Sequence, residues 1–77
     1  MQNIIGSNVR ILRLAKSLTQ EQLAANLQLK GGAFSRNTIA KIEAGIRQVT
    51  DVEVKMLAEV LAVSIATLFG EDHLADS

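Results

Sequence analysis

Four hydroxyl residues stand in the same local pattern along this sequence. Thr19, Ser35, Thr50 and Ser64 each have an apolar residue directly before them and another four positions after them. A hydroxyl at such a position accepts a hydrogen bond from an unpaired backbone N–H in the first turn of an α-helix, and the apolar pair packs across that turn. Four such starts in a chain of 77 residues restrict the fold to short helices joined by short connections.

The remaining pattern is also helical. Apolar residues recur at spacings of three and four, and no segment alternates with the period of a strand. Gln22 and Glu53, each three residues after a hydroxyl, complete two capping boxes, and Gly45 and Gly70 suit the left-handed position that ends a helix. The sequence therefore predicts an all-α fold with five helices. They are expected over residues 4–16, 20–28, 36–44, 51–61 and 65–69.

The length of the chain allows one small domain. A domain of this size buries only about 60% of the surface that its unfolded chain exposes, so association with a partner is expected. We expect the helical domain to occupy residues 1–70 and the acidic segment 71–77 to be a frayed tail.

Composition excludes several classes of protein. The chain has no cysteine, so it forms no disulfide and no thiolate metal site. It has no apolar run long enough for a membrane span and no basic start of a secretion signal, so we expect a soluble, cytoplasmic protein. His73 has no partner, and the Gly31-Gly32 pair lacks the spacing of a phosphate-binding loop. We therefore expect no enzymatic activity, no bound metal and no cofactor.

The charges are unevenly distributed although the chain has a net charge of zero. Residues 1–47 contain seven lysines and arginines and two glutamates, a net charge of +5, whereas residues 48–77 contain one lysine and six acidic residues, a net charge of −5. A basic half could face a polyanion while an acidic half faces away. Alternatively, the two sets pair with each other on the surface. The charges alone favour neither interpretation.

Several stretches, in their order, resemble the Xre group of helix-turn-helix regulators, to which the lambdoid phage repressors and Cro proteins belong. The resemblance covers roughly residues 5–70. It rests on the residues at 6–13, 18–24, 35–45, 57–64 and 68–69. It implies a compact lambda-repressor-like domain whose second and third helices form a helix-turn-helix that binds double-stranded DNA.

The resemblance also implies roles for particular residues. The third helix would enter the major groove, where Arg36 suits guanine, Asn37 suits adenine, and Lys41 reaches guanine or a phosphate. The second helix would cross the phosphate backbone with its N-terminus. Contacts to phosphates are expected from Thr19, Gln20, Lys30, Ser35, Thr38 and Arg47. Ser35 can equally serve as a helix cap alone, and an isolated surface cation is often only solvated.

Arg13 and Glu43 are expected to form a structural ion pair. The resemblance pairs them between the first helix and the end of the third, where a planar guanidinium matched to a carboxylate would fix the angle of the third helix.

The connection between the two helices of the motif departs from the family pattern, because it is longer. Residues 29–34 fill it, with Gly31-Gly32 allowing a sharp reversal and Phe34 expected to be anchored by Ile39. The middle of this segment is expected to be mobile. Lys30 could add a phosphate contact from it, or the segment is a tolerated surface insertion.

We expect the protein to be a sequence-specific regulator of transcription. We expect it to act as a repressor and to form a homodimer. The alternative is a protein-interaction module, such as an antitoxin or regulatory partner, on the same scaffold. Both interpretations draw on the surplus of apolar residues, and the region of the fifth helix is the expected dimer seam. The surplus apolar residues are Ile46, Val60, Ile65, Phe69 and Leu74.

Overall fold

The computed structural model describes residues 4–71, and they form five helices with no strand among them. This confirms the all-α prediction, and each helix boundary lies within two residues of the expected one. The expected tail at 71–77 lies outside the described residues, apart from Glu71. The helices are α1 (Gly6–Ala15), α2 (Gln20–Leu29), α3 (Arg36–Glu43), α4 (Asp51–Leu61) and α5 (Ile65–Leu68).

The four predicted caps begin α2 to α5. The hydroxyls of Thr19, Ser35, Thr50 and Ser64 accept from the backbone N–H three residues later, at 3.0, 3.1, 3.2 and 3.0 Å. Both capping boxes are complete. By contrast, α1 begins at Gly6, two residues later than expected, with no side-chain cap.

The five helices end in one common way. Each is followed by a residue with positive φ, and the next backbone N–H donates to the carbonyl five residues earlier. Such a motif satisfies carbonyls that the helix leaves unpaired. Two of the positions, Ser17 and Ala62, are not glycine and were not predicted as stops. The five residues are Ser17, Gly31, Gly45, Ala62 and Gly70.

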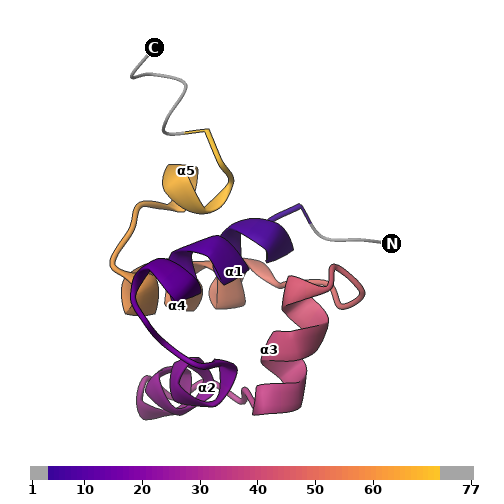
Figure 1. The fold of residues 1–77 in the computed structure, drawn as a ribbon, viewed down its shortest axis with the longest axis vertical. Coiled ribbons are helices and arrows are strands. Elements are labelled where there is room, and N and C mark those ends of the chain that lie inside the picture. The colour runs from indigo at the N-terminus through magenta and orange to yellow at the C-terminus, as the bar shows by residue number, and fades with distance from the viewer. Residues whose placement is uncertain (1–3, 72–77) are drawn as a thin grey trace.

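The helices surround one apolar core. Figure 1 shows α1 crossing in front of α4, with α5 at one end of the molecule and α2 beside the start of α3 at the other. Packing of α2 and α1 against α3 fixes the third helix in place. The fully buried side chains of the helices are Val9, Leu23, Leu27, Ile39, Ile42, Leu57, Leu61 and Leu68. Within the described residues, none of the helices is both long and apolar enough to cross a membrane.

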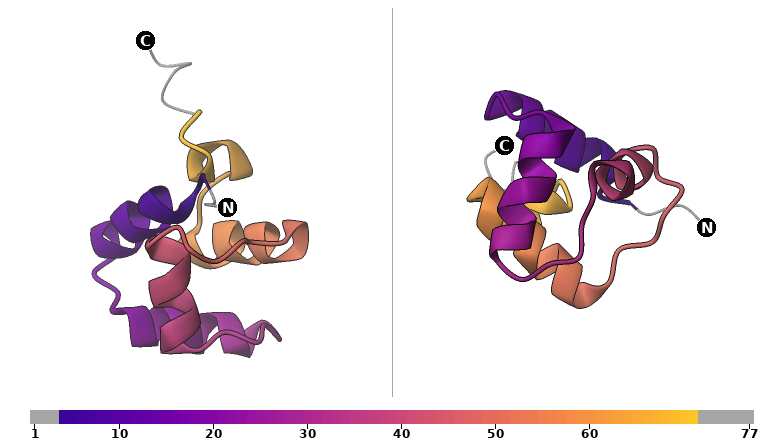
Figure 2. Two further views of the ribbon diagram at one scale, coloured as in Figure 1. Left: turned by 90° about the vertical axis from the view of Figure 1, so that its right-hand side faces the viewer. Right: turned by 90° about the horizontal axis from the view of Figure 1, so that it is seen from below.

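The lengthened connection 30–35 folds back along α2 before α3 begins (Figure 2). Phe34 is buried, as expected, and its carbonyl accepts a hydrogen bond from the Gln28 side chain. The middle of the connection is packed too, because a Cβ at Gly32 would lie 2.8 Å from both Met56 and Phe34. The segment therefore packs against α2 and α4.

Candidate nucleic-acid interface

One face of α3 holds the helix in the core and another faces solvent. Ile39 and Ile42 are completely buried, whereas Arg36, Asn37 and Lys41 are exposed. Asn37 and Lys41 are one turn apart and share a face. The fold thus presents all three residues that the sequence predicted as base-reading.

The start of α3 lies beside the start of α2. Arg36 borders a shallow hollow of about 550 Å³ together with Thr19, Gln20 and Glu21. The unpaired N–H groups at a helix N-terminus and its positive dipole end attract anions. Arg36 therefore lies next to the start of α2, the helix end that the sequence predicts to hold a phosphate.

Ser35 and Thr38 form one local unit at the start of α3. The Ser35 hydroxyl accepts from the Thr38 N–H, and the two hydroxyl oxygens are 3.0 Å apart. Ser35 is exposed and Thr38 half-buried. The predicted cap is thus present, and Ser35 is exposed at the start of α3.

Glu43 connects three helices. Its carboxylate accepts hydrogen bonds from Arg13 Nε at 2.6 Å and from Arg13 Nη2 at 3.1 Å, so the expected ion pair is present and bidentate. The two side chains are only 8% and 3% exposed. Arg13 Nη1 also donates to the Leu18 carbonyl at 2.7 Å. The amide of Gln20, the first residue of α2, donates to Glu43 Oε1 at 3.1 Å.

This bond to Gln20 was not predicted. The sequence suggested Gln20 only as a phosphate contact, since no local pattern links it to a residue at the far end of α3. In the fold its side chain ties α2 to α3, and its backbone N–H remains at the helix start.

Arg47 is also engaged within the protein. Its guanidinium donates to both carboxylate oxygens of Glu53, at 3.0 and 2.9 Å. The hydrogen bond from Arg47 is the main cause that lowers the pKa of Glu53, and the same contact raises the pKa of Arg47. Glu53 was predicted only as part of a capping box, which it also completes by accepting from the Thr50 N–H. This pair joins the basic and acidic halves of the sequence.

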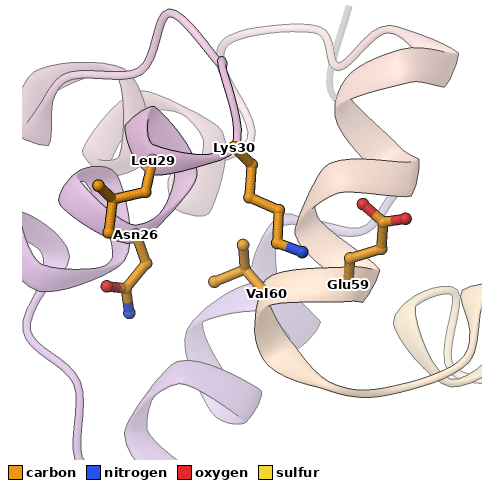
Figure 3. A pocket seen from close by; sticks show the side chains of 5 residues that line it. All are labelled: Asn26, Leu29, Lys30, Glu59 and Val60. Atoms are coloured by element: carbon orange, nitrogen blue, oxygen red, sulfur yellow. The ribbon is translucent and has the colours of Figure 1, made fainter.

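Lys30 lies apart from the other predicted contacts. It is at the C-terminal end of α2, and its side chain extends towards α4, on the side of Glu59 and Val60 (Figure 3). The structure does not bring Lys30 to the starts of α2 and α3.

Two small residues that the sequence reasoning passed over continue the outward face of α3, one inside the helix and one directly after its end. Ala40 is half-buried and Ala44 is exposed, and they are one turn apart, beside Asn37 and Lys41. A methyl group can contact the methyl of thymine in the major groove. The four-residue spacing on a predicted recognition helix could have identified them.

A short helix held on another by its apolar face, with a cationic and exposed first turn, is the arrangement of a DNA-binding helix-turn-helix domain. Residues 9–68 match the helix-turn-helix family, and the chain belongs to that family.

Two known proteins are similar to this chain. An uncharacterized HTH-type transcriptional regulator, y4dJ of Sinorhizobium fredii (strain NBRC 101917 / NGR234), is 36% identical over 64 residues, which cover 83% of this chain and 77% of that protein. The crystal structure of the restriction-modification controller protein C.AhdI from Aeromonas hydrophila is similar with a TM-score of 0.74 and 34% sequence identity. The likeness covers 84% of this chain and 87% of that chain.

Proposed function

We propose that this protein is a sequence-specific, double-stranded DNA-binding regulator of transcription that reads the major groove with α3. The observation that carries the proposal is the exposed, cationic first turn of α3, packed beside the N-terminus of α2. The similar proteins named as a transcriptional regulator and a controller protein support the same function.

The residue roles follow from position and chemistry. Asn37 and Lys41 face outward from α3 and read base edges, and Arg36 reads a guanine from the edge of the same surface. Contacts to phosphates, which position the protein without reading sequence, come from the backbone N–H groups and side chains at the two helix starts and from the half-exposed Arg47. Those at the helix starts are Thr19, Gln20, Ser35 and Thr38.

Repression and dimerisation complete the proposal. A two-fold dimer would place two copies of α3 on the halves of a palindromic site. Ile65 supports a seam at α5, because this apolar side chain is about half exposed there.

Selection from a pool of random duplexes tests the function directly. The wild-type chain should enrich one motif, and Arg36→Ala should lose about 1–3 kcal/mol of binding to that motif with little change on random duplexes. Fluorescence anisotropy at constant salt measures both. Lys16→Ala, an exposed cation at the end of α1, is the matched control and should retain specificity.

The alternative is a protein-interaction module, which the exposed apolar side chains favour. Ile11, Leu14 and Ile46 are each more than half exposed. Such a module would enrich no motif from the pool and would bind any duplex weakly. Equal loss of affinity on selected and random duplexes for Arg36→Ala would contradict the base-reading role.

A further inference from the structure

A second hollow lies at the other end of α2. It has a volume of about 450 Å³, and its lining comes from the last turn of α2 and the last turns of α4. Figure 3 shows the side chains of α2 on one side and those of α4 on the other. The lining residues are Asn26, Leu29, Lys30, Glu59 and Val60.

Leu29 is the most exposed large apolar side chain described, at 87%. The chain on either side of Leu29 is held by hydrogen bonds. The Gly32 N–H donates to the Leu27 carbonyl at 3.0 Å, and the neighbouring Gln28 side chain holds the Phe34 carbonyl. Leu29 is therefore presented by a hydrogen-bonded turn, next to the half-buried Val60.

The charges around this apolar centre are balanced. Lys30 is on the α2 side and Glu59 on the α4 side, and both are exposed. An acidic partner would meet Glu59 and a basic partner would meet Lys30. A two-fold rotation would bring the lysine of each copy towards the glutamate of the other and the apolar projection of each copy towards the other's hollow, and an isologous contact requires this kind of complementarity.

We propose that this hollow is a docking surface for a second copy of the same chain. Leu29 of one copy enters the hollow of the other, and Lys30 faces Glu59 of the partner subunit, with the same contacts repeated by symmetry. The surface is at the C-terminal end of α2, whereas α3 begins beside its N-terminal end, so a docked copy leaves the recognition turn open (Figure 2).

This contact is separate from the seam proposed at α5. Two different self-contacts on one chain would allow dimers formed at α5 to join further, and each contact can be removed without the other.

Sedimentation of the full chain over a range of concentrations tests the proposal. Leu29→Gln, which removes the apolar projection without adding a charge, should raise the dissociation constant of self-association by roughly tenfold or more. Lys30→Glu should have a similar effect because it places two acidic residues opposite each other. Adding Glu59→Lys to it should restore the wild-type constant.

Lys16→Glu is the matched control for the charge change and should associate as the wild type does. Circular dichroism should show that every variant remains folded, because both Leu29 and Lys30 are exposed. A wild-type chain that stays monomeric overturns the proposal, and so does a Leu29→Gln variant with the wild-type dissociation constant. DNA binding is a separate readout: its absence in the wild type would refute the regulator function and leave this surface untouched.

Discussion

Glu43 is a buried link between α3 and the two helices that pack against it. Its carboxylate joins Arg13 of α1 and Gln20 of α2 to the end of α3, and it is almost fully buried. Glu43→Ala should lower the free energy of unfolding by about 3–5 kcal/mol, because it leaves a buried guanidinium without its partner. Chemical denaturation measures this change.

The exposed Glu59 provides a control for that substitution. Glu59→Ala should stay within about 0.5 kcal/mol of the wild type. If Glu43→Ala had the same free energy of unfolding as this control, the structural role of the ion pair would be refuted.

The pair of Arg47 and Glu53 predicts an acid-dependent change in stability. Its hydrogen bonds lower the pKa of Glu53 below the ordinary 4.5. The carboxylate therefore stabilises the fold above that pH, and this contribution is lost as the pH falls through the lower folded value. Glu53→Gln should be less stable than the wild type at neutral pH, and the difference should shrink below about pH 4.5.

Urea denaturation at several pH values measures both proteins. Glutamine keeps an oxygen for the Thr50 N–H, so the variant isolates the charge. Glu59→Gln should not differ from the wild type at any of these pH values, and a difference for Glu53→Gln that is constant with pH would count against the ion pair.

Among the structural elements, the helix ends offer the clearest test of backbone strain. Ala62 ends α4 with φ of 58°, a conformation that costs a residue with a Cβ about 1–2 kcal/mol. Ala62→Gly should raise the free energy of unfolding by about 1 kcal/mol, since glycine adopts this conformation freely. Ala25→Gly, in the exposed interior of α2, should lower it by about 0.5–1 kcal/mol. Two changes of the same sign would contradict this explanation.

The starts of the helices could be predicted from sequence, but not all of their ends. A cap such as Thr19 acts on a backbone group three residues away, so its pattern is local. Ser17 and Ala62 adopt positive φ although they are not glycines, and their residue types do not predict this conformation.

For the candidate site, the exposed residues of α3 were predictable because their spacing follows the helix period. The partners Gln20–Glu43 and Arg47–Glu53, and the direction of Lys30, were not. They depend on how separate segments meet in the fold.

The distribution of charge over the whole molecule predicts how binding responds to salt. If several cations and helix starts meet phosphates, the logarithm of affinity should fall by about 0.9 per contact for each unit of log salt. Arg47→Ala should reduce this slope by about 0.9. Lys30→Ala should leave the slope unchanged, because Lys30 extends towards α4. Anisotropy titrations at several salt concentrations measure the slope, and an equal loss for both variants would contradict the placement of the interface.

Within α3, the side chains that attach the helix and those that face outward are different residues. Ile39, Ile42 and Glu43 hold it, while Asn37 and Lys41 make no contribution to the buried core. Exchanging the outward residues should therefore alter stability by no more than about 0.5 kcal/mol each. On the proposed base-reading role of these residues, the scaffold can be retargeted, by evolution or by design, to a new operator without being rebuilt.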